Sequence, residues 1–295
     1  MLPHMLWFLV LGPAAALSLF LGFLWFFQEK VIFQPSSTLG VRYPTSNPRG
    51  MKNPSEHGMD YEDVYLHSAD GTRIHMWMIT QPNPNRMTVP TILYLQSNAG
   101  NCGFRLPILS RFYKHFLTNI AVLSYRGYGF SSGVSTEQGI YSDAVAALQY
   151  LESRDDIHKK KIFLYGSSIG SAVALTLAQR MVDSVSGIIL ENPFTTLYAI
   201  AVATLPFLKW LPLLNFFMRV KMDNLSIISN LTLPLLILTG EDDTTVDPCQ
   251  SIQLYKASPS KVKINLRIPK AGHNNLWEVD ADRCLKEILK FIQLH

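Results

Sequence analysis

The chain has 295 residues, which is enough for one α/β domain with an appendage or for two small domains. Hydrophobic residues make up 48% of the chain and charged residues only 16%, and the formal net charge is +4. The basic residues are scattered instead of gathered in a patch, so the sequence predicts no nucleic-acid partner. The three cysteines are far apart and lack a paired spacing, so we expect no disulfide framework, no bound metal and no other cofactor.

The N-terminal segment is long and apolar. Residues 5–27 include no charged residue, and a helix of about 20 residues spans the hydrocarbon core of a bilayer. Trp7 and Trp25 lie near the two ends of the segment, where membrane helices often carry aromatic residues. A cleaved signal peptide is the alternative, but its apolar stretch is shorter and its start is basic. The sequence therefore predicts an uncleaved, single-pass transmembrane signal anchor within residues 1–33.

The side of the membrane is less clear from the sequence. Lys30 and Arg42 follow the apolar segment and no lysine or arginine precedes it, which favours a cytoplasmic catalytic domain. Two glycosylation sequons, at Asn224 and Asn230, would matter only on the lumenal side. The orientation stays open, and we expect the endoplasmic reticulum or the plasma membrane as the location.

The remaining chain divides into a linker and one domain. Residues 34–60 are rich in proline, serine, asparagine and glycine, as linkers are. From 61 to 295, short apolar runs alternate with helical patterns, which predicts a mainly parallel sheet with helices on both faces. The expected strands are 61–67, 73–79, 91–95, 120–124, 161–165, 185–190, 233–238 and 263–268. The expected helices are 105–116, 136–153, 169–182, 248–256 and 282–293.

A short pattern around Ser168 indicates a serine nucleophile. Gly166, Ser168 and Gly170 form a G-x-S-x-G pattern between an apolar strand and a helix. The turn at such a site is too tight for side chains beside the nucleophile, and the start of the following helix favours a developing negative charge. The alternative is a plain strand–turn–helix connection with small residues. The setting favours Ser168, and not Ser167, as the nucleophile.

A serine hydroxyl needs a general base, and that base needs a carboxylate to orient it. In hydrolases with this motif, the acid and then the histidine follow the serine along the chain. Four acidic residues occur within seven positions after the strand expected at 233–238. The spacing from the glycine that ends this strand favours Asp243, with Asp242 as the alternative. His273 follows the last expected strand, which makes it the candidate base.

The oxyanion of such a reaction is stabilised by backbone N–H groups. One donor is the residue after the nucleophile, Ile169, and the other comes from the loop after the strand 91–95. In that loop Asn98 is the candidate donor, through its backbone. The alternative is an ordinary turn rich in asparagine and glycine.

The motifs SNAGN, SYRGYGFSSG, GSSIGS, ENPF, GEDD and AGHNN occur in this order behind one N-terminal apolar segment. Over about residues 60–292 the sequence resembles the subfamily of α/β-hydrolase-domain proteins that includes the fungal bud-emergence homologue. The resemblance implies an α/β-hydrolase fold with a mostly parallel eight-stranded sheet, helices on both faces and a preceding transmembrane helix. It also implies a triad of Ser168, Asp243 and His273. Gln96-Ser97 stands where the family usually has His-Gly, which makes the geometry of the oxyanion hole a point to inspect.

An apolar insertion at about 195–225 is predicted between two strands, where this fold commonly carries a cap. Phe207, Trp210, Phe216 and Phe217 are its candidate substrate-binding residues, because aromatic side chains could line an acyl pocket beside a bilayer. The alternative is a core helix that packs on the sheet.

These observations predict a membrane-anchored serine hydrolase. The expected substrate is an acyl ester or thioester. Relatives of the subfamily that the sequence resembles are protein depalmitoylases, which suggests acylated protein as well as lipid. A non-catalytic membrane-tethered scaffold, acting in polarity or trafficking, is the alternative from another class, and only the altered Gln96-Ser97 favours it. A serine peptidase on the same fold is a third interpretation.

Overall fold

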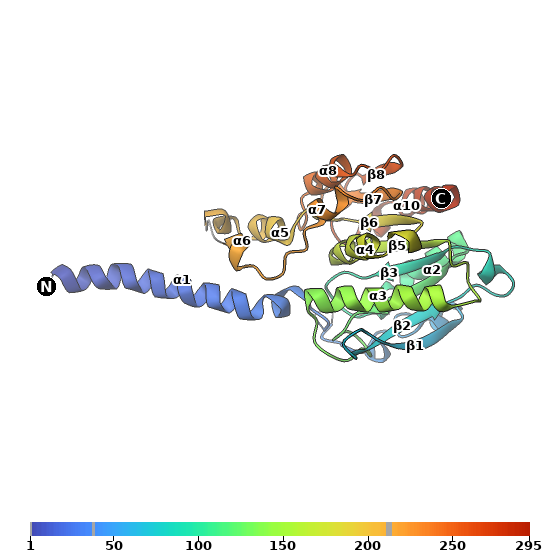
Figure 1. Ribbon diagram of the computed structural model, residues 1–295, viewed down its shortest axis with the longest axis horizontal. Helices are drawn as coiled ribbons and strands as arrows, with labels where there is room; N and C mark the ends of the chain where they lie inside the picture. The colour runs from blue at the N-terminus through green and yellow to red at the C-terminus, as the bar shows by residue number, and fades with distance from the viewer. Residues whose placement is uncertain (1, 37–38, 211–213) are drawn as a thin grey trace.

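One eight-stranded sheet forms the centre of the structure, in the order β1-β2-β4-β3-β5-β6-β7-β8 (Figure 1). The computed structural model describes residues 2–36, 39–210 and 214–295. The two pairings of β2, with β1 and with β4, are antiparallel, and all other neighbours are parallel. The strands are β1 (Tyr61–His67), β2 (Arg73–Ile79), β3 (Thr91–Leu95), β4 (Asn119–Ser124), β5 (Ile162–Ser167), β6 (Gly187–Glu191), β7 (Leu235–Gly240) and β8 (Lys263–Ile268). The predicted mostly parallel eight-stranded sheet is confirmed.

All five expected helices are present. They are α2 (Leu106–Phe116), α3 (Glu137–Ser153), α4 (Ile169–Arg180), α8 (Pro248–Ala257) and α10 (Ala281–Leu294). Short helices that the sequence patterns did not predict are α7 (Asn224–Ile228), α9 (Leu276–Val279), η1 (Pro44–Ser46), η2 (Pro54–His57), η3 (Asn85–Met87), η4 (Cys102–Arg105) and η5 (Val182–Ser184). Each has at most five residues, so it is too short to produce a helical period of apolar residues.

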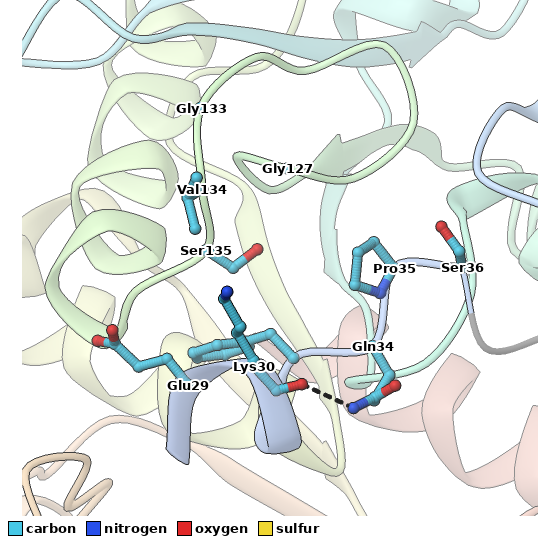
Figure 2. Close-up of a pocket in the computed structure, with 10 residues that line it drawn as sticks. Glu29, Lys30, Gln34, Pro35, Ser36, Gly127, Gly133, Val134 and Ser135 are labelled. Carbon is cyan, nitrogen blue, oxygen red and sulfur yellow. Dashed lines mark hydrogen bonds between the residues drawn. The ribbon is translucent and has the colours of Figure 1, made fainter. Parts of the chain in front are cut away.

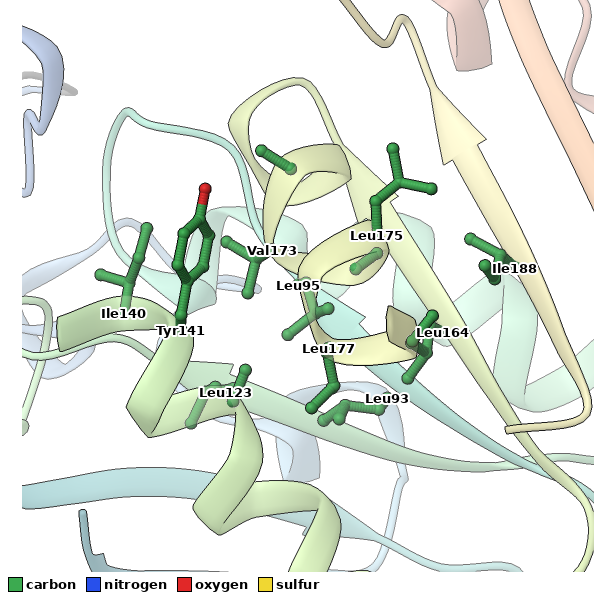
Figure 3. Packing of buried hydrophobic residues seen from close by; sticks show 14 of the residues in the cluster. Leu93, Leu95, Leu123, Ile140, Tyr141, Leu164, Val173, Leu175, Leu177 and Ile188 are labelled. Atoms are coloured by element: carbon green, nitrogen blue, oxygen red, sulfur yellow. The ribbon is translucent and has the colours of Figure 1, made fainter. Parts of the chain in front are cut away.

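Side chains alternate between two hydrophobic layers along each central strand. Leu93 and Leu95 of β3 point to the layer under α3 and α4, whereas Ile92 and Tyr94 point to the layer under α2 and α10. Figure 3 shows Leu93 and Leu95 close to Leu164 of β5 and beneath the side chains of α4. Both faces of the sheet are covered, which is why its parallel strands read as continuous apolar runs.

The N-terminal helix α1 (Leu2–Ile32) extends away from the sheet (Figure 1). In the part of the chain that the structure describes, no helix has the combined length and hydropathy of a membrane span. The predicted anchor covers residues 5–27, and the side chains at 5–10, 13, 14, 17 and 24 lie outside the described residues. The transmembrane assignment therefore stays a prediction.

The predicted linker, residues 34–60, lies against the catalytic domain. Gln34 forms a parallel bridge with Ala99, beyond the end of β3. Further along, the side-chain amides of Asn47 and Asn101 donate to each other at 2.8 and 2.9 Å. Both asparagines are at most 2% exposed, so this reciprocal pair satisfies their buried polar groups.

The insertion between β6 and β7 contains α5 (Leu197–Thr204), η6 (Pro206–Trp210) and α6 (Leu214–Phe217). Residues 211–213, within the predicted cap, lie outside the described residues. Figure 1 shows α5 and α6 beside α1, beyond the edge of the sheet. The segment does not cover a face of the sheet as a core helix would.

Two buried glutamines differ in their hydrogen bonds, so replacing each one tests whether its buried amide stabilises the fold. The side-chain amide of Gln81 donates to the carbonyls of Tyr113 and Thr118, at 2.9 and 3.2 Å. Gln96 is completely buried, and its amide nitrogen and oxygen have no hydrogen-bond partner in the described structure. A buried amide without a partner is unfavourable, whereas a paired one contributes to stability.

We expect Gln96→Met to leave the free energy of unfolding unchanged or to raise it. The matched change Gln81→Met should lower it by about 1–3 kcal/mol, because the carbonyls of Tyr113 and Thr118 lose their donor. Denaturant unfolding of both variants, followed by circular dichroism, measures the difference. Equal losses in the two variants would show that Gln96 has a polar partner in solution.

Candidate active site

Ser168 lies in a strained turn between β5 and α4. Its φ angle is +51°, a conformation that is costly for a residue with a side chain. A Cβ atom on Gly166 would lie 2.4 Å from the carbonyl oxygen of Gly170, and one on Gly170 would lie 2.0 Å from the carbonyl oxygen of Leu95. Glycine is therefore required at both positions, and the turn holds Ser168 at the end of the sheet.

The structure brings the three predicted triad side chains together. His273 Nε2 is 3.0 Å from Ser168 Oγ, and His273 Nδ1 is 2.6 Å from Asp243 Oδ2. The Asp243 side chain is 2% exposed and the His273 side chain 13% exposed, so the relay is largely shielded from water. A hydroxyl, an imidazole and a carboxylate in this order can transfer the serine proton to the imidazole.

Asp243 is fixed by the backbone of its own loop. Its Oδ1 accepts hydrogen bonds from the N–H groups of Thr245 and Val246, at 2.8 and 2.9 Å, while Oδ2 faces His273. Asp242, the alternative from the sequence, has an exposed side chain. The geometry therefore selects Asp243 as the carboxylate that meets the imidazole.

Asn192, which the sequence analysis did not single out, connects the end of β7, before the acid loop, to the loop that carries the base. It follows β6 with a φ of +45°, a conformation that asparagine tolerates. Its Oδ1 accepts from the N–H of Gly240 at 2.8 Å, and its Nδ2 donates to the carbonyl of His273 at 3.0 Å. The side chain thus joins the end of β7 to the histidine loop.

Glu191, at the end of β6, is a buried carboxylate beside the nucleophile. It accepts hydrogen bonds from Tyr165 Oη, from Trp277 Nε1 at 3.0 Å and from Ser167 Oγ at 3.3 Å. Burial, and then the charge of Glu191, raises the pKa of Tyr165 well above its ordinary value, so the phenol remains a donor. These three donors satisfy the carboxylate, and its bond to Trp277 also holds the segment that follows His273.

The two predicted oxyanion donors lie beside Ser168. Ile169 is the first residue of α4, so its N–H has no acceptor within the helix. The carbonyl of Asn98 accepts from Tyr128 Oη at 2.6 Å and from the N–H of Gln34 at 2.9 Å, which fixes the orientation of this loop. Asn98, Ile169 and Ser168 line one cavity of about 530 Å³. The donor role of the Asn98 N–H stays a prediction.

The four predicted substrate-binding aromatics do not line that cavity. Phe217 lines a neighbouring apolar cavity, and Phe216 lines a third one beside α1. Phe207 and Trp210 are 55% and 76% exposed and line none of the described cavities. The sequence shows that this segment is apolar, but composition does not tell which side chains face the nucleophile.

The apolar wall of the catalytic cavity is formed by other residues. Ile32 at the end of α1, with Leu197 and Ile200 of α5, lines it together with Ser168 and His273. The sequence analysis did not single out any of these three apolar residues. A second cavity, of about 410 Å³, also reaches Ser168 and His273, and its lining includes four charged residues, Arg105, Arg111, Glu191 and Glu278.

Another cavity, of about 470 Å³, lies at the base of α1. Figure 2 shows Glu29 and Lys30 at the end of the helix, with Val134 and Ser135 on a facing loop. Gln34 Nε2 donates to the carbonyl of Lys30 at 2.8 Å. No triad residue lines this cavity, so it is separate from the site around Ser168.

The described residues contain no cluster of three or more His, Cys, Asp or Glu side chains that could hold a metal ion. All three cysteines are free thiols. Burial raises the pKa of the Cys102 thiol to about 12, so it is protonated at neutral pH. Cys102 is therefore a poor nucleophile, and Ser168 is the residue with an activating base.

Known proteins are similar to this chain over most of its length. The model described as the prolyl oligopeptidase family matches residues 114–295. The α/β-hydrolase-domain protein WAV2 of Arabidopsis thaliana is 36% identical over 279 residues, covering 90% of this chain and 88% of its own length. The protein bem46 of Schizosaccharomyces pombe is 34% identical, with 86% of this chain and 83% of its own length covered. A Saccharomyces cerevisiae relative named as a membrane protein, YNL320W, is 33% identical, with 92% and 93% covered.

Solved structures share the fold. The esterase Pf2001 of Pyrococcus furiosus has a TM-score of 0.67 at 19% identity, covering 82% of this chain and 92% of its own. The acetyl xylan esterase of Paenibacillus sp. R4 has a TM-score of 0.63 at 19% identity, covering 80% and 84%. The relatives confirm the resemblance to the bud-emergence subfamily. The chain belongs to the prolyl oligopeptidase family of α/β hydrolases, in the group of α/β-hydrolase-domain proteins that includes WAV2 and bem46.

Proposed function

We propose that the protein is a membrane-anchored serine hydrolase that cleaves carboxylic ester or thioester bonds through an acyl-enzyme at Ser168. The observation that carries the proposal is the continuous relay from Ser168 through His273 to Asp243, with contacts of 3.0 and 2.6 Å. No requirement of the fold demands this combination of side chains, whereas acyl transfer by serine needs all of them.

In the first half of the reaction, Ser168 Oγ attacks the substrate carbonyl carbon while His273 Nε2 accepts the hydroxyl proton. The electron pair of the carbonyl moves to its oxygen, which the N–H groups of Ile169 and Asn98 stabilise. The tetrahedral intermediate then collapses, the bond to the leaving alcohol or thiol breaks, and His273 gives the proton to that group. The product is an ester of the acyl group with Ser168.

In the second half, water gives a proton to His273 and its oxygen attacks the acyl-enzyme. Collapse of the second intermediate returns the proton to Ser168 and releases the carboxylic acid. Asp243 orients and stabilises the imidazolium, because its Oδ1 is held by two backbone N–H groups while its Oδ2 faces the imidazole.

Acylated proteins or lipids at a bilayer are the substrates that we propose. The apolar insertion and the end of α1 both border the catalytic cavity, which supports a substrate with an acyl chain. The second candidate is a peptidase that uses the same triad, and the description of the matching family favours it. Turnover of aminopeptide p-nitroanilides, without turnover of acyl esters, would select the peptidase.

We expect Ser168→Ala to abolish labelling by a fluorophosphonate probe and to reduce ester hydrolysis by a factor on the order of 10⁶, because the nucleophile is lost. The neighbouring change Ser167→Ala is the matched control and should keep its labelling. In-gel fluorescence and p-nitrophenyl ester turnover measure the two effects. A folded wild-type protein that neither labels nor turns over esters would instead favour the non-catalytic scaffold.

The membrane anchor is a separate part of the proposal. Residues 5–27 are uncharged and α1 has 31 residues, and a relative that is 33% identical is named as a membrane protein. Single-pass insertion in the endoplasmic reticulum or plasma membrane would place the catalytic cavity near the bilayer surface.

We expect the full chain to stay in the membrane pellet after alkaline carbonate extraction. Replacing Leu19 and Phe23 together by arginine should move it to the supernatant, since each charge costs about 2.5–3.5 kcal/mol near the centre of a spanning helix. Leu294→Arg, on an exposed position of α10, is the control and should leave the protein in the pellet. Release of the wild-type chain by carbonate would contradict the anchor.

A further inference from the structure

Three cavities follow one another from Ser168 along α1. The first is the catalytic cavity of about 530 Å³, whose apolar wall includes Ile32, Leu197 and Ile200. The second, of about 260 Å³, is lined by the same three residues and by Phe217. The third, of about 440 Å³, shares Phe217 with the second and continues along α1 to Ser18. The shared lining residues make the three cavities neighbours in a row along α1.

The second cavity is lined almost entirely by hydrocarbon. Its described lining includes no titratable side chain, and its only polar residues are Gln28 and Thr204. Gln28 is 7% exposed, and its Oε1 accepts from the backbone N–H groups of Arg219 and Val220, at 2.8 and 3.0 Å. Because this oxygen is already paired, the cavity favours an apolar chain over a polar group.

The end of α1 is fixed to the oxyanion loop. The carbonyl of Ile32 accepts from Asn98 Nδ2 at 3.2 Å. Two residues on, the N–H of Gln34 donates to the carbonyl of Asn98 at 2.9 Å, and the carbonyl of Gln34 accepts from Gly100 at 3.0 Å. These bonds place Ile32 directly beside the loop that holds the predicted oxyanion donor.

The same helix is also fixed to the insertion. Besides the two bonds of Gln28, Glu29 pairs with Arg219 at 3.3 Å, and the Arg219 guanidinium lies over the ring of Trp25 at 5.7 Å. Thus α1 is held between the oxyanion loop on one side and the insertion on the other. It forms a wall of the cavities and is not only a tether.

A cavity on the opposite side of Ser168 contains Arg111 and Glu191 and also reaches His273, and Arg105 lines both this cavity and the catalytic one. The strongly apolar lining begins in the second cavity along α1, beyond Ile32 and Ile200. Arg105 is already engaged, since its NH2 donates to Ser97 Oγ and to the carbonyl of Ala99. An ester substrate has an acyl group and an alcohol group, and the apolar acyl group fits the side of the site along α1.

We propose that the acyl arm of the substrate lies in this channel along α1, from Ser168 past Ile32 and Ile200 to Phe217, and that the enzyme is therefore selective for long-chain acyl esters or thioesters. The inference rests on the proposed hydrolysis at Ser168. It adds that α1 is part of the acyl-binding site. An acyl chain in the bilayer would then reach the nucleophile through this site without crossing water.

The test is the dependence of kcat/KM on chain length for p-nitrophenyl butyrate and palmitate, with the full chain in detergent micelles. Ile200 lines both of the first two cavities, so Ile200→Trp fills the space where they meet. We expect it to lower kcat/KM for palmitate at least about tenfold and to change the value for butyrate less than about twofold. Ala203→Trp, on an exposed position of the same helix, should leave both values unchanged.

An equal fall in kcat/KM for both esters, or an unchanged kcat/KM for palmitate, would contradict the proposed acyl channel. Thermal melting checks that Ile200→Trp folds; if it does not fold, Ile32→Trp, which lines the same two cavities from the side of α1, takes its place under the same criteria. Wild-type turnover of butyrate without palmitate overturns the channel and leaves the hydrolase intact. Absence of turnover and of fluorophosphonate labelling in the wild type overturns the hydrolase itself.

Two further substrates identify the source of the chain. A palmitoylated cysteine peptide presents it as a protein thioester, and monopalmitoylglycerol presents it as a lipid ester. Turnover of either one that is sensitive to Ile200→Trp supports the channel, and the ratio of the two kcat/KM values tells a protein source from a lipid source. Turnover of both that is insensitive to Ile200→Trp contradicts it.

Discussion

The close approach of α4 to the sheet is the constraint on which the site depends. Gly170 contacts the carbonyl of Leu95 so closely that a single added carbon atom would overlap it. This contact sets the first turn of α4 against β3, next to Ser168 with its positive φ angle and to the Ile169 N–H, which has no acceptor within the helix. It also brings the end of β3, and with it Asn98, next to Ser168. The nucleophile and both predicted oxyanion donors are thus positioned by one backbone contact.

The direction of the strands explains why distant residues converge. Strands β5 to β8 are parallel, so the segments that follow them meet at one edge of the sheet. Ser168, Asn192, Asp243 and His273 each lie in one of these segments. Asn192 has no group that takes part in proton transfer, yet its amide bonds to two of the other segments and keeps the spacing between acid and base. The relay therefore depends on a side chain outside the triad.

Most of the sheet and the triad could be predicted from the sequence, because their signals are local. Buried parallel strands read as continuous apolar runs, and side-chain caps such as Thr136 and Asp247 mark the starts of α3 and α8. The spacing from Gly240 already favoured Asp243 over Asp242, and the structure places Asp243 against the imidazole of His273. The contact of Ile32 with the oxyanion loop could not be predicted, because it joins residues 66 positions apart. The amino-acid composition of the insertion likewise does not predict which way the side chains of Phe207 and Trp210 point.

The bridge between Gln34 and Ala99 has a practical consequence for handling this protein. Hydrolases with an N-terminal apolar helix are commonly trimmed to obtain a fragment that needs no detergent. A fragment beginning after residue 36 would retain the whole sheet and all three triad residues. It would nevertheless lose every backbone partner that the first segment offers to the loop of Asn98 and Gly100, along with one side of the cleft at Ile32. Such a fragment would keep a well-folded core, but its active site would be incomplete.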